Sequence, residues 1–259
     1  MRTGVLLLAV SVGGCALFTL DVDALRSGAS EDGGAPPSVG DASASDAPGA
    51  CRCKAPASCV QGRCSFSESW TGNDGASWPP VWKFEEPRSG QPKLPVIEGN
   101  AGYVEDPSFT RIFPDLEAAG RVDMSVSVRV SENAAGLRLY CRRQSAGARY
   151  GAEFRAQSGP LRVVRIDEGE SVTVLRESDV TVAADTPHHI RIECENVTET
   201  RVEIRAKAWP VGTPEPDAFE IGLDESPAAS AAGAFGMEIL EFDGRDHTLD
   251  DFEVVYEPR

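Results

Sequence analysis

Arginine and aromatic residues alternate with apolar residues along several segments of the chain. In residues 137–142, Leu137 and Leu139 alternate with Arg138 and Tyr140. Every second side chain of a β-strand points to the same face, so the polar set would share one surface. Guanidinium groups bind carboxylates in two-point contacts and aromatic rings stack on sugars, so this surface could bind an acidic or uronic glycan. The candidate ligand-binding residues are Arg129, Arg138, Tyr140, Arg142, Glu153, Arg155 and Trp209.

The same pattern also fits a solvated sheet surface without a ligand. Arginine and glutamate on neighbouring strands would then form ion pairs that each contribute only a fraction of a kcal/mol. An open, aromatic-lined groove would favour glycan binding. A face filled by paired arginine and glutamate would favour a scaffold.

Four cysteines lie within residues 51–64, at positions 51, 53, 59 and 64. In an exported chain such a cluster indicates disulfides. Cys51 and Cys53 are too close to pair with each other, which leaves two connectivities. We prefer the interlocking one, Cys51–Cys59 with Cys53–Cys64, and a zinc site built from the four thiolates is the alternative.

Two further cysteines, Cys141 and Cys194, lie in the apolar phase of their segments. Cys141 follows Leu137 and Leu139 in that phase, and Cys194 follows Ile192. A disulfide between them would join distant strands and would contribute several kcal/mol in the chain-entropy model. The alternative is two separate buried thiols that pack as small apolar groups.

The elements that would position these residues are short β-strands. Val122, Met124, Val126, Val128 and Val130 alternate with polar residues, and turns rich in Gly, Ser, Asn and Asp separate the segments. No stretch keeps a helical period over three turns. The pattern predicts an antiparallel β-sandwich of jelly-roll size over residues 66–259. We expect one or two members of an aromatic cluster to close its edge, namely Trp70, Trp78 and Trp82.

Several motifs of residues 66–258 occur in an order that resembles the concanavalin A-like, LamG-like jelly-roll superfamily. They include the opening Phe66–Trp70 and the segments 188–192, 205–216, 233–236 and 249–254. The resemblance implies two curved antiparallel sheets. It also implies a concave face of the kind commonly used to bind carbohydrate or protein.

Catalysis is not supported by the carboxylates of the chain. Laminarinase-like glycosidases of this superfamily carry a Glu-x-Asp-x-(x)-Glu strand motif, because cleavage with retention needs a carboxylate nucleophile and an acid about 5–5.5 Å apart. Residues 241–246 end in Asp and are broken by Gly-Arg, and residues 166–170 end a strand in a turn. The histidines at positions 188, 189 and 247 do not form a recognisable catalytic arrangement either. We therefore expect a non-catalytic domain.

A structural calcium ion is the cofactor that the resemblance implies. Related jelly rolls often bind calcium where the first and last strands meet, and Glu68 and Asp251 match those places. Calcium needs six to eight oxygen ligands, so these side chains alone would not complete a site. The alternative is that Asp251 and its neighbour Asp250 only form a charged start to a strand.

The N-terminus predicts export and lipid anchoring. Residues 1–14 combine Arg2, a short apolar run and small residues, as in a secretory signal. Val12-Gly13-Gly14-Cys15 resembles the lipobox of bacterial lipoproteins, which implies cleavage before Cys15 and acylation of its thiol. Ala16 follows the cysteine, and by analogy with lipoprotein sorting this favours the outer membrane. A general secretion signal is the alternative.

Composition sets the remaining expectations. The net charge of −16 would repel phosphate backbones, so nucleic acid is not an expected partner. Residues 15–50 would form a lipidated N-terminus and a disordered linker, and residues 51–65 a small disulfide segment. We expect an envelope lipoprotein that displays a binding module, most favourably for carbohydrate. The alternatives are a glycoside-acting enzyme of the same fold and a structural protein that binds another envelope protein.

Overall fold

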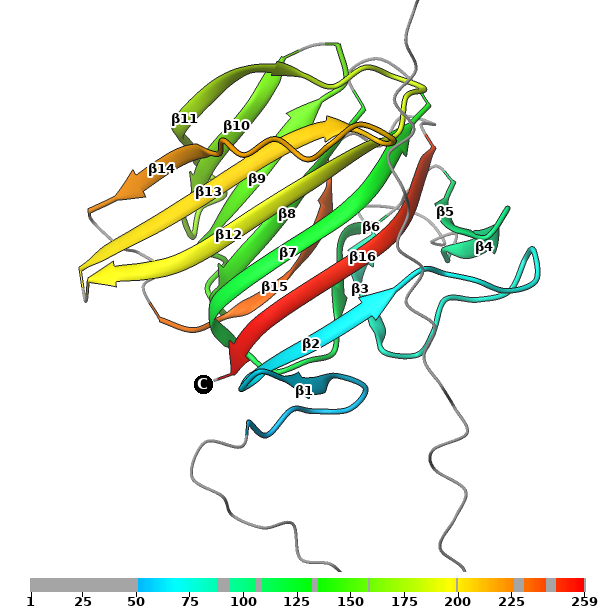
Figure 1. Ribbon diagram of the computed structural model, residues 1–259, viewed down its shortest axis with the longest axis horizontal. Helices are drawn as coiled ribbons and strands as arrows, with labels where there is room; N and C mark the ends of the chain where they lie inside the picture. The colour runs from blue at the N-terminus through cyan, green and yellow to red at the C-terminus, as the bar shows by residue number, and fades with distance from the viewer. Residues whose placement is uncertain are drawn as a thin grey trace, which may run out of the picture. The chain divides into compact units, whose positions relative to one another are not determined.

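Two antiparallel β-sheets lie face to face in the computed structural model (Figure 1). The structure describes residues 51–87, 94–105, 109–131, 135–157, 159–198, 200–225, 231–240 and 246–258. Within these ranges every strand pair is antiparallel and no helix occurs. The described residues therefore contain no helix that could cross a membrane. The predicted all-β antiparallel sandwich is confirmed. The predicted signal peptide, linker and lipidation site Cys15 lie outside the described residues.

The first sheet has nine strands. Seven of them follow the order β1-β2-β16-β7-β12-β13-β14, while β5 pairs with β16, and β4 pairs with β5. The strands are β1 (Ser58–Val60), β2 (Arg63–Glu68), β4 (Val96–Glu98), β5 (Ala101–Val104), β7 (Ala119–Val130), β12 (His188–Thr198), β13 (Arg201–Pro210), β14 (Glu220–Asp224) and β16 (His247–Pro258).

The second sheet has seven strands in the order β11-β10-β9-β8-β15-β6-β3. Its consecutive strands β8 to β11 form a meander, and the other three strands come from both ends of the domain. The strands are β3 (Trp82–Pro87), β6 (Phe109–Pro114), β8 (Gly136–Arg143), β9 (Arg149–Arg155), β10 (Pro160–Ile166), β11 (Val172–Thr181) and β15 (Ala234–Ile239).

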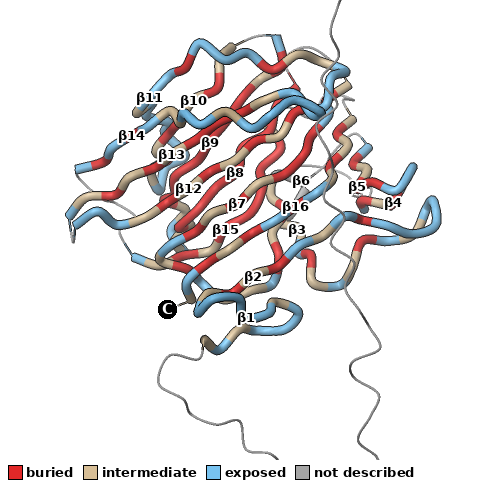
Figure 2. Tube along the Cα trace, in the orientation of Figure 1, coloured by how far each residue is buried: buried red, intermediate tan, exposed pale blue. Residues whose placement is uncertain are grey.

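The core lies between the two sheets. Along β7, Val122, Met124, Val126, Val128 and Val130 are at most 1% exposed, as their alternation predicts. Each such side chain contributes about 1.5–3 kcal/mol when it leaves water. The buried positions concentrate on the central strands of both sheets, and the edge strands β1 and β11 are mostly exposed (Figure 2).

The three tryptophans near the start of the domain are all buried. Trp70, Trp78 and Trp82 are 0–6% exposed, and their rings pack with centroid distances of 4.6–5.5 Å. Gly102 of β5 is needed beside them, because a Cβ there would lie 2.6 Å from the Trp78 ring. The aromatic cluster therefore belongs to the core.

The disulfides tie the chain at two levels. The structure has the interlocking pairs Cys51–Cys59 and Cys53–Cys64, and it joins Cys141 of β8 to Cys194 of β12. The last bond links the two sheets through the core. Cys64 lies on β2, which pairs with β16, so the strand runs through the boundary expected after residue 65.

Candidate functional site

The residues predicted to form one binding face lie on both sheets. Arg138 and Tyr140 of β8 and Glu153 of β9 lie on the outward side of the seven-stranded sheet. Arg129 of β7 and Trp209 of β13 lie on the outward side of the nine-stranded sheet. The prediction of a single face is wrong, because these strands pair into different sheets whose polar sides point away from each other.

A row of alternating charges crosses the seven-stranded sheet, and we call it the charge row. Each member is the direct cross-strand partner of the next, so the row runs perpendicular to the strands. Opposite charges placed this way attract across each strand pair. From β11 to β3 the members are Glu177, Arg162, Glu153, Arg138, Glu238, Arg111 and Glu85.

The centre of the charge row is buried and bonded on both sides. Arg138 donates to Glu153, with Nε 2.8 Å from Oε2, and also donates to Glu238. Arg111 donates from Nε to Glu238 Oε1 at 2.9 Å and from Nη1 to Glu85 Oε2 at 3.1 Å. Arg138, Glu153 and Glu238 are only 2–7% exposed. Buried charges of this kind persist when they are paired and hydrogen-bonded, so the row is a structural network.

Glu170, in the turn between β10 and β11, extends the network over the sheet. Its carboxylate accepts from Arg149 of β9 at 2.5 Å and from Arg111 of β6 at 2.7 Å. Four strand spacings, about 19 Å in a flat sheet, separate β10 from β6. The face must therefore curve, with the turn arching toward β6. Paired arginine and glutamate fill this face, which is the arrangement expected of a scaffold.

Tyr140 lies beside the charge row and is fully buried. Its register partners are Gly151 on β9 and Gly236 on β15, so no side chain flanks it directly. A Cβ at Gly151 would lie 2.7 Å from Arg138, and one at Gly236 would lie 2.7 Å from Phe113. The Tyr140 hydroxyl has no hydrogen-bond partner among the described residues. Tyr140 is thus enclosed and does not form an open stacking platform.

Arg142 does not share the face of Arg138. Its φ of 55° interrupts the alternation of β8, and its side chain donates to Asn196 of β12 and to the carbonyl of Gly120 in β7. Burial lowers the pKa of its guanidinium. Arg143 takes the place on the outer face and donates to Glu85 at 2.9 Å. Arg142 therefore connects the two sheets and is not a surface residue.

Arg155, the last of the predicted arginines, ends β9 opposite Gly136. It is half-buried and lies on the same side of the sheet as Glu153. Arg129 is exposed on β7, where its register partner is Thr248. Neither residue lines the groove described next.

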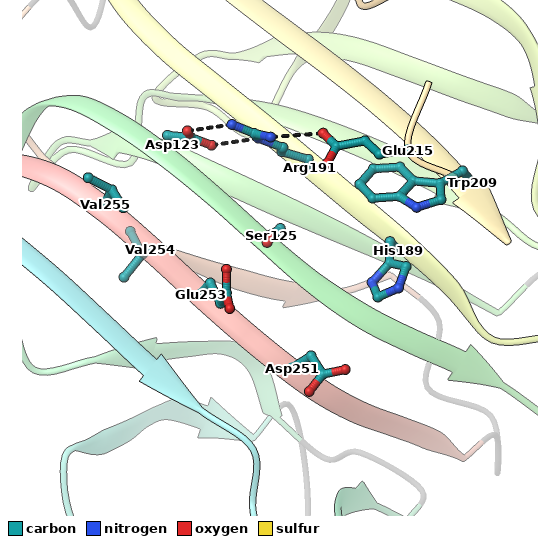
Figure 3. Close-up of a pocket in the computed structure, with 10 residues that line it drawn as sticks. All are labelled: Asp123, Ser125, His189, Arg191, Trp209, Glu215, Asp251, Glu253, Val254 and Val255. Carbon is teal, nitrogen blue, oxygen red and sulfur yellow. Dashed lines mark hydrogen bonds and ion pairs between the residues drawn. The ribbon is translucent and has the colours of Figure 1, made fainter. Parts of the chain in front are cut away.

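A groove of about 410 Å³ lies on the outward side of the nine-stranded sheet (Figure 3). Its floor follows β7, where the polar phase carries Ser125 and Ser127. Neighbouring strands present much larger side chains in register with these serines, so the surface is hollowed along β7. The groove is lined by Asp123, Ser125, His189, Arg191, Trp209, Glu215, Asp251, Glu253, Val254 and Val255.

One wall of the groove carries two neighbouring aromatic rings. His189 of β12 and Trp209 of β13 are register partners, and their rings lie 5.1 Å apart at an interplanar angle of 31°. Both side chains are half-buried. Lys207 lies 5.8 Å from the Trp209 ring centroid and 3.8 Å from that of Phe219, so cation–π contacts help to hold the Trp209 ring in place.

Arg191 is held in a fixed position at the groove. Its Nε and Nη2 donate to the two carboxylate oxygens of Asp123 at 2.8 and 2.7 Å, and its Nη1 donates to Glu215 at 2.8 Å. These bonds, led by the one to Asp123, raise the pKa of Arg191. Glu215 also pairs with Lys207 at 2.6 Å, and the hydrogen bond from Lys207 lowers the pKa of Glu215. The loop after β13 is thereby fixed to the sheet.

The opposite wall is acidic and comes from β16. Asp251 and Glu253 are both exposed there. The pairing of β16 with β7 shifts between Asp250 and Glu253, and Asp251 has a φ of 46°. This bulge brings Asp251 and Glu253 to the same groove. Among the lining residues, only Trp209 and Asp251 belong to the candidates from the sequence.

The predicted calcium ligands do not by themselves assemble a site. Glu68 uses one carboxylate oxygen to accept from the Trp70 amide at 2.9 Å. Within the described ranges, neither Glu68 nor Asp251 belongs to a group of three side chains whose ligand atoms converge. Calcium binding stays a prediction.

Comparison of the sequence with protein families and with characterised proteins finds no match. Among solved structures, a mutant of the alginate lyase Aly36B in complex with alginate trisaccharide is 10% identical. The match covers 75% of this chain and 98% of that one, with a TM-score of 0.49. LamAcat from Zobellia galactanivorans is also 10% identical, with coverages of 74% and 96% and a TM-score of 0.49.

A third similar structure is the carbohydrate-binding module CBM66 from Bacillus subtilis. It is 11% identical, the match covers 74% of this chain and 92% of that one, and the TM-score is 0.35. At such identities a likeness concerns the fold and not the ligand.

Proposed function

We propose that the protein is a non-catalytic module that binds carbohydrate in the groove over β7. The observation that carries this proposal is the half-buried Trp209–His189 pair, which faces a cavity lined by fixed hydrogen-bonding groups. Sugar rings pack their C–H faces on aromatic rings and present hydroxyls at their edges. Arg191 could donate, and the β16 carboxylates could accept, the hydrogen bonds that orient such a ligand.

The arrangement of carboxylates favours binding over cleavage. In laminarinase-like glycosidases the two carboxylates lie on one strand, in the motif Glu-x-Asp-x-(x)-Glu, about 5–5.5 Å apart. Asp251-Phe252-Glu253 also lies on one strand, β16, but does not match that motif. Asp123 and Glu215 are engaged by Arg191. The groove thus offers recognition groups, and its acids do not form the motif of a cleaving pair.

The test is oligosaccharide binding by Trp209→Ala, measured by glycan array and then by calorimetry on each hit. Loss of a central aromatic contact should weaken binding about tenfold or more, as tryptophan truncation does at binding hot spots. Near-ultraviolet circular dichroism should stay unchanged apart from the missing Trp209 signal, because that side chain is outside the core.

Arg129→Ala is the matched control. Arg129 is exposed on the same sheet and outside the groove, so its variant should bind within about twofold of the wild type. Equal binding by wild type and Trp209→Ala would exclude the groove as the site. A loss in Arg129→Ala alone would move the site to another part of the sheet.

We further propose that the module is displayed from a membrane through acylated Cys15. The lipobox-like residues before Cys15 support this membrane attachment, and three disulfides are typical of an exported protein. Cys15→Ala should move the protein from the membrane fraction to the soluble fraction. Membrane association that persists in this variant would refute lipid anchoring.

A further inference from the structure

We infer that the groove selects sugars that carry a protonated amine over neutral and anionic sugars. This inference rests on the proposed function and assigns a ligand class to the same site. It starts from the charges of the lining residues, which differ from those expected of a site for an acidic glycan.

Carboxylates dominate the groove. Four lining residues are acids and one is an arginine, which gives a formal charge of −3 from these five side chains. Arg191 is already engaged by Asp123 and Glu215, so its positive charge is compensated within the wall. An anionic sugar would meet excess negative charge here and over the whole protein, whose net charge is −16.

The carboxylates that a ligand would meet are those of Asp251 and Glu253. Both side chains are exposed at the groove, and no ion pair of the described residues includes either of them. The small Ser125 of the floor separates them from the wall of Trp209 and Arg191 (Figure 3). A cation in the ligand could therefore reach them without displacing a residue of the protein.

Sugar geometry brings an amine to this wall. A β-1,4-linked pyranose that packs one face on Trp209 presents its equatorial substituents at the ring edges, toward the walls of the groove. An equatorial ammonium group at C2 can donate up to three hydrogen bonds, and charged donors to carboxylates form the stronger class of hydrogen bond. Glucosamine-type units match this arrangement, whereas uronic acids would place like charges together.

Three hexasaccharides with the same β-1,4 backbone form the experiment. Chitosan, chitin and cellulose hexamers carry an ammonium, an acetamide and a hydroxyl group at C2. In mildly acidic low-salt buffer, calorimetry should show chitosan hexamer binding about tenfold tighter than cellohexaose. Added salt should reduce this preference, because part of it is electrostatic.

Variants assign the preference to the β16 wall. Asp251→Asn with Glu253→Gln should reduce the chitosan preference, which is the ratio of the cellohexaose to the chitosan-hexamer dissociation constant, to about twofold or less. Asp179→Asn is the control for general attraction between a polycation and an acidic protein, since Asp179 is an exposed acid on β11 of the other sheet. It should keep the preference.

The outcomes separate the inference from the proposed function. Equal binding of the three hexamers, with a loss in Trp209→Ala, would keep the carbohydrate site and overturn the amine selectivity. A chitosan preference that Asp179→Asn lowers as much as the β16 variant would also overturn it. Absence of binding to all three hexamers and to every glycan of the array would refute both.

Discussion

At the scale of residues, Arg138 and Arg191 show that partners decide what an arginine can do. Both lie in the polar phase of a strand and bond to two acids. Arg138 is 7% exposed, and acids bond to it from both neighbouring strands. The Arg191 side chain is 28% exposed and borders a groove that small serines keep open. The first is suited to structure, and the second can contact a ligand.

Tyr140 leads to a prediction about stability. Because its buried hydroxyl meets no described hydrogen-bond partner, Tyr140→Phe removes a desolvated polar group and should raise the free energy of unfolding by about 1 kcal/mol. Urea unfolding followed by tryptophan fluorescence measures this change. A loss of more than about 1 kcal/mol would show that the hydroxyl has a partner.

Tyr150→Phe is the matched control for that prediction. Tyr150 is equally buried, but its hydroxyl donates to Asp224 at 2.7 Å, and Asp224 is 4% exposed. Removing this donor should lower the free energy of unfolding by about 1.5–2 kcal/mol, as expected for a hydrogen bond to a charged group. The two substitutions delete the same atom, and their effects on the free energy of unfolding should have opposite signs.

Residue positions could be predicted from the sequence only while the strand alternation stayed regular. The alternation correctly placed Leu137, Leu139 and Cys141 in the core. It failed at Arg142, because a φ of 55° there sends two consecutive side chains toward the other sheet. Arginine has no particular preference for that conformation, so nothing in the local sequence indicates the irregularity.

At the scale of elements, the charge row is a property of strand pairing. Its seven members are spread from residue 85 to residue 238, and each is an ordinary polar residue in its own strand. The alternation of charge exists only across the sheet, in the order that β3, β6 and β15 join the meander. The sequence predicted the strands and the sandwich, but not which strands are neighbours. For the same reason it did not predict the groove beside Ser125.

The network around the charge row predicts loss of stability in acid. Burial alone would raise the pKa of Glu85, but hydrogen bonds from Arg143 and Arg111 outweigh burial and lower it below the ordinary 4.5. At Glu170 burial also favours a higher pKa, but the interactions with Arg149 and Arg111 outweigh it and lower the pKa. A lowered folded-state pKa gives stability that is present above the unfolded-state value and is lost as the pH falls through the folded-state value. Stability should therefore fall steeply below about pH 4.5.

Urea unfolding at a series of pH values measures this dependence. The Glu85→Gln and Glu170→Gln double variant should have a shallower fall below about pH 4.5, because two carboxylates that must be protonated are missing. Asp179→Asn, outside the network, should keep the wild-type slope. A double variant whose slope matches the wild type would show that other acids govern the acid transition.

At the scale of the whole molecule, the two outward faces are suited to different roles. The seven-stranded sheet closes its outer face with paired charges, and the nine-stranded sheet keeps an open groove. The two faces are connected by packing between the sheets, by the Cys141–Cys194 disulfide and by side-chain hydrogen bonds such as those of Arg142. The bonds that cross this core should therefore control whether the domain unfolds as one unit.

The Cys141–Cys194 disulfide crosses the core and should stabilise the fold more than an edge disulfide. It joins β8 to β12 over a separation of 53 residues, whereas Cys51–Cys59 closes a separation of 8. In the chain-entropy model the two bonds contribute about 4 and about 2.5 kcal/mol. Replacing Cys141 and Cys194 by Ala should thus lower the urea midpoint more than replacing Cys51 and Cys59, with fluorescence of the buried tryptophans as the signal. An equal or smaller effect of the core pair would show that packing alone holds the sheets together.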